Sequence, residues 1–250
     1  MQQNNSNIEW FKTWFDSPFY HQLYKERNQI EAEFFIKNIF SYLNPSLNSK
    51  VLDVACGKGR HSVFINQMGY TTDGFDLSEN SIKDARQNEN QTLKFYVNDI
   101  RIPLNKETYD YAFNLFTSFG YFDDDIDNTR AIKSIASSLK QNGVFVIDFF
   151  NSEKVKSNLN PSETKIINGI EFKINKEIEQ GFVVKHIRFT QNSKEYHFTE
   201  RVKLLSLDDF YRYHKLAKLK IEEFFGDYSL RPFNSVDSDR LIIISKKNGI

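Results

Sequence analysis

The sequence predicts an α/β fold in which a parallel sheet is wound by helices and carries an antiparallel β insertion. Short apolar segments alternate with helical patterns over residues 50–150. A glycine-containing turn joins the first apolar segment to a helix. From residue 151 the pattern changes to segments that alternate apolar and polar residues between turn signals. For a chain of 250 residues, one domain with an elaboration is the expected organisation.

Two helical segments are expected before the first strand. Residues 8–15 carry apolar groups at helical spacing, and the chain is then interrupted at Pro18. Residues 27–42 form a longer amphipathic pattern, with Ile30, Phe34 and Ile39 on or near the buried face.

The first predicted strand covers residues 51–54 and leads into the glycines Gly57 and Gly59. A helix is expected over residues 61–68. Glycines let the backbone approach a ligand closely, and a helix N-terminus presents free N–H groups to an anionic group. Asp53 at the end of this strand could accept hydrogen bonds from a cationic ligand or fix the loop.

A second strand, residues 70–76, ends in Asp76, about 20 residues beyond the first glycine. In a parallel sheet this carboxylate lies beside the glycine loop and can bind the two ribose hydroxyls of an adenosine. The order of strand, glycine turn, helix and acidic strand end therefore indicates a nucleotide-type site.

Three more strands are expected at residues 93–97, 109–115 and 144–150, with helices at residues 79–88 and 126–139. Ser78 suits the N-cap of the first helix. Residues 123–125 are three aspartates that directly precede the second helix, so we interpret them as a helix cap and not as a metal site. Residues 140–143 are expected to close that helix.

The region after residue 151 predicts four antiparallel strands at residues 165–168, 171–179, 182–191 and 195–205. The dipeptides between them are plausible hairpin turns. The side chains that this insertion could offer to a substrate are His186, Arg188, Tyr196, His197 and Arg201. A solvated sheet or a dimer interface explains the same pattern. A helix to about residue 217 and strands at residues 219–225 and 241–245 complete the chain.

Five segments in order carry a family resemblance: VLDVACGKGRHS, GFDLSENSI, VNDIRIPL, YDYAFNLFTSFGYF and GVFVIDFFN. They resemble the successive motifs of the class I S-adenosylmethionine-dependent methyltransferases. The resemblance covers residues 50–150, with a weaker echo over residues 219–246. It implies a Rossmann-like seven-stranded sheet with helices on both faces, the last strand antiparallel, and S-adenosyl-L-methionine as the cofactor.

The resemblance also implies a division of the chain. Residues 1–45 would be an N-terminal helical lid, and residues 46–150 and 206–250 the cofactor-binding core. Residues 151–205 would be an insertion that binds the substrate or forms a dimer.

The resemblance assigns cofactor-binding roles to residues at the ends of the strands. Asp99 would accept a hydrogen bond from the adenine amino group, and the backbone N–H of Ile100 would meet a ring nitrogen. The lid would contribute Tyr20, Tyr24 and Arg27. The remaining candidates are Asp53, Ala55, Cys56, Gly57, Gly59, Arg60, Asp76, Leu77, Asn114 and Phe116. Ala55 stands where the family usually has glycine, and alanine is disfavoured only at positive φ.

The acceptor is expected to face an aromatic segment. Phe119, Tyr121 and Phe122 would line its pocket, together with Asp148. The general base is left open, with Tyr121 and His61 as the candidates. This neutral segment replaces the acidic tetrapeptide motif of amine-modifying DNA methyltransferases, which counts against methylation of nucleic-acid bases.

Composition narrows the remaining possibilities. Lys plus Arg and Asp plus Glu number 33 each, so the charge balance gives no reason to expect a nucleic-acid or membrane partner. One cysteine excludes an intramolecular disulfide and a multi-thiolate metal site. The polar N-terminus and the absence of a long apolar run predict a cytoplasmic, soluble protein. We expect it to be a monomer or a homodimer.

These observations predict an enzyme that transfers a methyl group to an N or O atom of a small molecule. Two alternatives remain at this stage. The first is an NAD(P)-dependent oxidoreductase, although the loop lacks the third glycine and an acid precedes it. The second is a non-catalytic protein that binds S-adenosylmethionine.

Overall fold

The computed structural model describes residues 9–24 and 29–248, which form two compact units. The larger unit contains residues 28–157 and 205–250, and the smaller contains the first two helices with residues 158–204. The family resemblance implies one lid over residues 1–45. Here helix α3 (Gln29–Leu43) belongs to the larger unit, and only α1 (Trp10–Phe15) and α2 (Pro18–Leu23) join the antiparallel strands.

The larger unit is built on a seven-stranded sheet of order β10-β11-β5-β4-β1-β2-β3. The first five strands in sequence are parallel, whereas β11 is antiparallel to both β5 and β10. The strands are β1 (Lys50–Val54), β2 (Thr71–Asp76), β3 (Leu93–Val97), β4 (Tyr109–Asn114), β5 (Leu139–Phe150), β10 (Leu219–Phe225) and β11 (Arg240–Lys247). This confirms the predicted Rossmann-like sheet and its antiparallel last strand.

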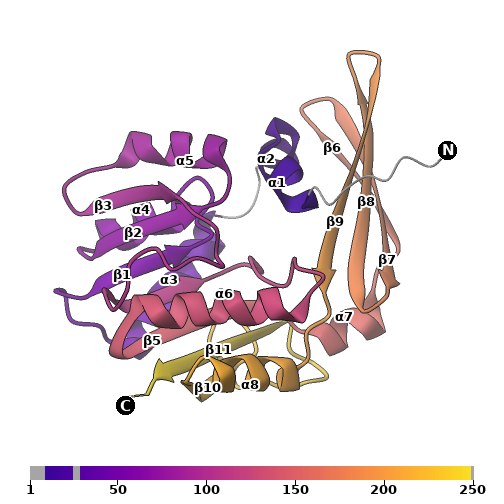
Figure 1. The fold of residues 1–250 in the computed structure, drawn as a ribbon. Helices are drawn as coiled ribbons and strands as arrows, with labels where there is room; N and C mark the ends of the chain where they lie inside the picture. The colour runs from indigo at the N-terminus through magenta and orange to yellow at the C-terminus, as the bar shows by residue number, and fades with distance from the viewer. Residues whose placement is uncertain (1–8, 25–28, 249–250) are drawn as a thin grey trace. The chain divides into compact units, whose positions relative to one another are not determined.

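Helices cover both faces of this sheet (Figure 1). α3 and α4 (Arg60–Gln67) pack on one face, over a core that includes Val51, Phe113 and Val146. The alternate residues of the same strands point to the other face, where Phe145 and Phe149 meet α8 (Leu207–Leu216). The remaining helical elements are α5 (Glu79–Ala85), the short 3₁₀ helix η1 (Arg86–Asn88), α6 (Asp125–Ser138) and α7 (Ser152–Asn158). Near-continuous apolar strands are typical of a sheet buried on both faces.

Side-chain caps fix the start of three helices of the larger unit, α5, α6 and α8. Ser78 accepts a hydrogen bond from the N–H of Ser81, and Asp124 accepts one from Ile126. Ser206 and Asp209 form a capping box at the start of α8. The aspartates before α6 therefore act as the predicted cap, and no group of acidic, histidine or cysteine side chains among the described residues could hold a metal ion.

The predicted pattern differs from the structure in several places. Ile30 and Phe34 of α3 are exposed, not buried. Residues 140–143 do not close a helix, because β5 already begins at Leu139 and its register on β4 shifts between Tyr109 and Tyr111. The irregularity includes Asn142, which has a positive φ of 62°. Helix α7 was not predicted, because seven mostly polar residues carry little periodic signal.

The smaller unit is a four-stranded antiparallel sheet of order β6-β7-β8-β9 with two short helices. Its strands are β6 (Ser162–Ile167), β7 (Ile170–Glu179), β8 (Phe182–Gln191) and β9 (Lys194–Lys203). Both residues of each two-residue turn have positive φ, as Asn168 and Gly169 do, which is the geometry of tight hairpins. The insertion is therefore a sheet of four strands, as predicted.

One face of this sheet carries an aromatic and aliphatic cluster that includes Trp14, Phe172 and Phe189. Glu200 is buried in it and accepts hydrogen bonds from Trp14 Nε1 at 2.7 Å and from the Tyr24 hydroxyl at 2.8 Å. Lys185 Nζ lies 3.0 Å from the same carboxylate. A buried charge needs such partners, so Glu200 ties both helices to the strands.

Over the part of the chain that the structure describes, no helix combines the length and the apolar character needed to cross a membrane.

Candidate functional site

The candidate site lies at the edge of the large sheet where the parallel strands end. Across the neighbouring strands β5, β4, β1, β2 and β3, this edge presents in order Asp148, Asn114, Asp53, Asp76 and, just past β3, Asp99. Strand β1 has β2, the next strand along the chain, on one side and β4 on the other. The order of the strands therefore reverses at β1. In open α/β sheets, ligands bind at such a switch point. The carboxylates predicted for the site therefore share one edge.

The glycine loop after β1 is fastened to β2. The N–H of Cys56 donates to the carbonyl of Phe75, and the N–H of Gly57 donates to Asp76 Oδ2 at 2.8 Å. Gly59 has a φ of 78°, and a Cβ there would lie 2.5 Å from the ring of Phe95. Only glycine therefore fits at position 59.

Ala55 adopts a left-handed backbone with a φ of 57°. This is the conformation in which glycine, the usual family residue, is unstrained, whereas alanine is disfavoured. The chain tolerates that strain at the entrance to its glycine loop.

Asp53 is buried beneath the loop and accepts a hydrogen bond from the Ser62 hydroxyl at 2.5 Å. Burial raises the pKa of its carboxyl to about 7, although the hydrogen bonds from Ser62 oppose that shift. The charge of Asp76 raises this pKa further, and the Arg60 guanidinium lowers it. Asp53 is therefore a buried acid whose charge a nearby cation would favour.

Asp99 is held by Arg101. The Arg101 Nη2 atom lies 2.6 Å from Asp99 Oδ2, and its Nε atom lies 3.0 Å from Oδ1. Arg101 also reaches Asp127 of α6 at 2.9 Å and lies over the ring of Phe122. The predicted adenine acceptor thus belongs to an ion-pair network that the sequence motif did not reveal.

Asn114 closes the edge between β4 and β1. Its amide nitrogen donates to the carbonyls of Val54 at 3.1 Å and Ser118 at 3.2 Å, which leaves the side-chain oxygen as an acceptor. That oxygen is buried and has no hydrogen-bond partner among the described residues. A buried acceptor without a partner is uncommon and indicates a missing polar group.

Phe116 follows β4, and its ring lies parallel to that of His61 with centroids 4.9 Å apart. The Arg60 guanidinium lies over the same ring at 5.6 Å and donates to His61 Nε2 at 3.1 Å. The structure therefore brings Phe116, Arg60 and His61 together from two separate motifs.

The predicted acceptor-side residues have different surroundings. Phe119 is a fully buried core residue packed against Phe210 and Tyr213. The Tyr121 hydroxyl donates to the carbonyl of Thr117 at 2.5 Å. Asp148 is also fully buried and is engaged by other protein groups.

The lid candidates Tyr20 and Tyr24 and the candidates of the insertion belong to the smaller unit. Tyr20 contacts the rings of Trp14 and Tyr24 in the aromatic cluster, and Tyr24 donates to Glu200. Arg27 lies outside the described residues. Strand alternation and register place the basic insertion candidates His186, Arg188, His197 and Arg201 on one face and Tyr196 on the opposite face.

Three residues at this edge escaped the sequence interpretation: Thr117, Tyr228 and Arg240. Each makes a hydrogen bond with the side chain of Asp148 or Arg240. Arg240 lies 92 positions from Asp148, so no local motif could have identified the pair.

The residues at this edge fit the cofactor that the motifs imply. A Cβ built on Gly57 would meet no protein atom within 4 Å, so the loop leaves space for a ligand. The acceptor oxygen of Asn114 and the acid Asp53 suit a ligand with hydrogen-bond donors and positive charge. Asp76 accepts from Gly57 through one oxygen and from Ser78 through the other, which fixes its carboxylate beside that space.

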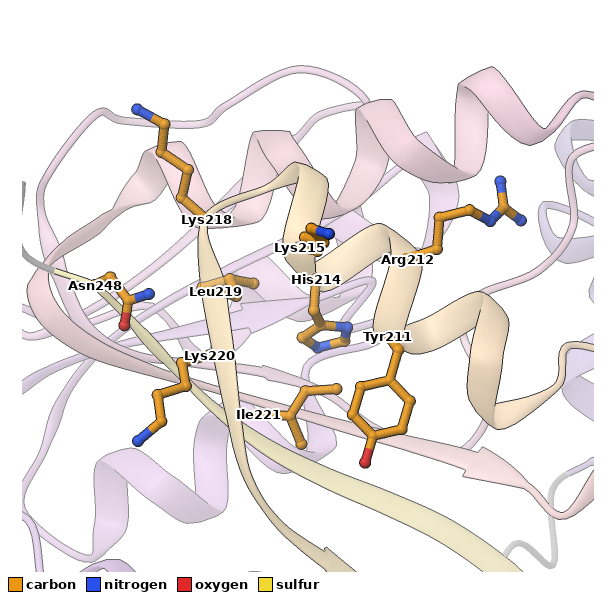
Figure 2. Close-up of a pocket in the computed structure, with 9 residues that line it drawn as sticks. All are labelled: Tyr211, Arg212, His214, Lys215, Lys218, Leu219, Lys220, Ile221 and Asn248. Carbon is orange, nitrogen blue, oxygen red and sulfur yellow. The ribbon is translucent and has the colours of Figure 1, made fainter.

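A separate hollow of about 490 Å³ lies between α8 and β10 (Figure 2). Its lining includes Tyr211, His214, Lys218 and Asn248, and the side chains of Lys218 and Arg212 point away from its centre. Because β11 is antiparallel to β5, the end of β11 next to Asn248 lies at the edge opposite the carboxyl ends of the parallel strands. The hollow is therefore not part of the candidate site.

Comparison with known proteins agrees with this geometry. A family model described as a methyltransferase domain matches residues 45–203, which is more than half of the chain. A probable S-adenosyl-L-methionine-dependent methyltransferase TehB of Haemophilus influenzae is 35% identical over 65 residues, covering 25% of this chain and 23% of that protein. A glycine/sarcosine N-methyltransferase of Parasynechococcus marenigrum is 29% identical over 135 residues, covering 52% of this chain and 46% of that protein. The chain thus spans less than half the length of these curated relatives.

Among solved structures, an S-adenosylmethionine-dependent methyltransferase from Clostridium acetobutylicum superimposes with a TM-score of 0.77. The match covers 92% of this chain and 97% of that one at 19% identity. At this identity the likeness concerns the fold.

Proposed function

Because this chain belongs to the class I S-adenosylmethionine-dependent methyltransferases, we propose that it methylates the nitrogen of a small-molecule amine by in-line displacement. The cofactor supplies a methyl group already activated on a sulfonium. The protein then has mainly to align the nucleophile with that methyl group, and good alignment can supply ~7–11 kcal/mol. The family assignment sets aside the oxidoreductase alternative.

The cofactor would be held along the carboxyl edge of the sheet. In this proposal Asp76 binds the ribose hydroxyls, Asp99 the adenine amino group, and Asp53 the cationic methionine end. The glycine loop and Asn114 would line the space between them. The support for these roles is that the five strand ends are adjacent along one edge of the sheet.

The observation that carries the choice of an amine is the state of the possible bases. Asp148 is buried in contact with Arg240, and the Tyr121 hydroxyl donates to a backbone carbonyl. His61 Nε2 accepts from Arg60 and its ring stacks on Phe116. A hydroxyl acceptor needs a base to remove its proton, whereas a neutral amine attacks without one. Because these possible bases are already engaged by other protein groups, the surrounding suits an amine.

The curated relatives support the same choice. Their names include glycine/sarcosine N-methyltransferase and glycine N-methyltransferase, which act on nitrogen. Since those matches cover less than half of each relative, they support the reacting atom and not a particular substrate.

The test has two steps. Calorimetry with S-adenosylmethionine first measures cofactor binding in the full chain. Formation of S-adenosylhomocysteine is then followed with small amines, each beside its hydroxyl counterpart, such as glycine with glycolate and an amino sugar with its parent sugar. We expect turnover with amines only, and a mass gain of one methyl group on nitrogen.

The variant Asp76→Asn tests the proposed cofactor site, because it keeps the size of the side chain and removes the charge. It should weaken cofactor binding by roughly 1.5–3 kcal/mol through loss of charge-assisted hydrogen bonds. Turnover confined to the hydroxyl compounds would overturn the amine proposal. Cofactor binding with no turnover of either class would favour the non-catalytic alternative.

We propose two roles for the remaining elements. Tyr20 and Tyr24 would belong to a lid over the cofactor, and the smaller unit would bind the acceptor or a second copy of the chain. The basic face with His186, Arg188, His197 and Arg201 is the substrate-binding candidate within that unit.

A further inference from the structure

Two consecutive residues after β4, Phe116 and Thr117, adopt left-handed backbone conformations. Their φ angles are 57° and 61°, and neither residue is glycine. For a β-branched residue such as threonine this region is an outlier. Conformations of this kind persist only where the surrounding structure holds them, and they cluster at functional sites.

The contacts that hold this turn come from Asp148 and Arg240. The N–H of Phe116 donates to Asp148 Oδ2 at 2.8 Å, and the N–H of Thr117 donates to the Asp148 carbonyl at 3.0 Å. Arg240 Nε lies 2.7 Å from Asp148 Oδ1, and its Nη2 atom donates to the Thr117 hydroxyl at 2.9 Å. Both strained residues are therefore bonded to the same ion pair.

The ion pair lies where the chemistry is expected. Asp148 is fully buried near the carboxyl end of β5, and Arg240 is the first residue of β11, paired with Phe150. Tyr228 adds a hydrogen bond from its hydroxyl to Asp148 Oδ2 at 3.3 Å, and the Arg240 guanidinium lies over its ring. Hydrogen bonds from this many donors hold the buried Asp148 carboxylate in one orientation.

The backbone conformation of this turn determines the position of the Phe116 ring. That ring stacks on His61 at the start of α4 and contacts the Tyr228 ring at 5.2 Å. A relaxed backbone at residues 116 and 117 would move the ring away from both neighbours. The position of the Phe116 ring beside α4 thus depends on Asp148 of β5 and Arg240 of β11.

We propose that Asp148 and Arg240 are positioning residues for methyl transfer: together they hold the turn of Phe116 and Thr117 and so place the aromatic wall beside the methyl group. The chemical part rests on the proposed function, whereas the geometric part does not. Asp148 acts through Phe116 and Thr117 and does not contact the acceptor.

The chain offers a matched control in a second ion pair of the same sheet. Lys50 Nζ lies 2.8 Å from the buried carboxylate of Asp73, which also accepts a hydrogen bond from the Tyr109 hydroxyl. Lys50 and Tyr109 begin β1 and β4, so this pair lies toward the opposite edge. Asp73→Asn should reduce stability without changing the turn.

Hydrogen exchange of the full chain, read by mass spectrometry on a peptide spanning residues 113–119, tests the geometric part without an acceptor. In Asp148→Asn and Arg240→Lys we expect the amides of residues 116 and 117 to exchange at least tenfold faster than in the wild type. Asp73→Asn should leave them unchanged. If Asp148→Asn does not fold, Thr117→Val removes the contact to Arg240 and gives the same readout. Unchanged local exchange in the variants that fold overturns the proposal.

The chemical part is measured with the amine identified above. Asp148→Asn should lower the rate at saturating cofactor and acceptor by tenfold or more, while the Kd for S-adenosylmethionine stays within threefold. Arg240→Lys should lie between it and the wild type. A loss of rate no greater than that of Asp73→Asn overturns the role in methyl transfer. If the wild type methylates no amine, the proposed function fails and the exchange experiment still decides whether the pair holds the turn.

Discussion

Ala55 shows how one side chain can set the strain of a ligand loop. It occupies a left-handed conformation at the end of β1, where a Cβ crowds the neighbouring backbone. Glycine adopts this conformation freely but loses more entropy on folding. The difference between the strain of alanine and the entropy loss of glycine is a small free energy that unfolding experiments can measure.

Ala55→Gly should raise the free energy of unfolding of the larger unit by about 0.5–1 kcal/mol, because relief of strain exceeds the added entropy of the unfolded chain. Denaturant unfolding measures the change. Ala85→Gly is the control, since Ala85 has a right-handed φ of −59° and should lose stability on the same substitution. A destabilised Ala55→Gly variant would contradict the strain at this position.

Asp53 makes the larger unit sensitive to pH. Its pKa is about 7 in the folded chain against an ordinary value of 3.8, because burial disfavours the carboxylate. The folded state therefore keeps a proton that the unfolded state has already lost between these two values. The contribution of Asp53 to stability is fully present below pH 3.8 and is lost as the pH rises through 7.

Cofactor binding should reverse this preference. A cationic ligand favours the ionised form of Asp53, so binding of S-adenosylmethionine at pH 6 should release a proton. Its Kd should weaken up to tenfold for each pH unit below 7. Calorimetry in two buffers of different ionisation enthalpy counts the released protons. Proton release that persists in Asp53→Asn would assign it to another group.

At the level of elements, Glu200 links the helices of the smaller unit to its strands. Burial alone would raise the pKa of Glu200, but Lys185 and the hydrogen bonds from Trp14 and Tyr24 hold it below its ordinary value. Its stabilising effect is therefore present above the ordinary pKa of 4.5 and is lost as the pH falls through the lower folded value.

Glu200→Gln should destabilise the smaller unit by roughly 2–4 kcal/mol, because it leaves the Lys185 ammonium without its charged partner. The only two tryptophans, Trp10 and Trp14, both belong to this unit, so tryptophan emission reports on it selectively. Glu195→Gln, at an exposed position of the same strand, is the control. Equal midpoints for both variants would show that the Glu200 charge contributes nothing.

At the scale of the whole molecule, the two units can be tested for a common response to one ligand. Proposed cofactor-binding residues lie in the larger unit, whereas the tryptophans and the lid candidates Tyr20 and Tyr24 lie in the smaller one. Unfolding can therefore be followed separately in each unit.

S-adenosylmethionine at 100 times its Kd should stabilise the larger unit by about 2.7 kcal/mol. If Tyr20 and Tyr24 cover the cofactor, the transition followed by tryptophan emission should rise as well. Thermal unfolding with tryptophan emission and far-UV circular dichroism, with and without cofactor, measures both effects. A tryptophan transition that does not move would remove the two tyrosines from the cofactor site.

Much of the large sheet could be predicted locally. The bounds of β3 and β10 were predicted to the residue, because each is a short segment that begins and ends with an apolar residue and carries aromatic or β-branched residues typical of strands. The hairpin turns of the smaller unit were predicted from the turn-forming dipeptides between its strands. The start of β5 and the short helix α7 were not, since an irregular register and a mostly polar helix leave no clear periodicity.

The sequence by itself indicated the family, the succession of strands along the chain and the position of Asp53, Asp76 and Asp99 at strand ends, because these depend on motifs that are contiguous along the chain. Only the tertiary structure revealed that Arg240 pairs with Asp148 and that Glu200 binds Trp14, across 92 and 186 positions. Such pairs form when strands and helices from distant segments pack together, and periodicity within a segment carries no information about that partner. The physical reason is that local sequence patterns determine helices and strands, whereas a buried charge must be paired with a partner that tertiary packing brings from a distant segment.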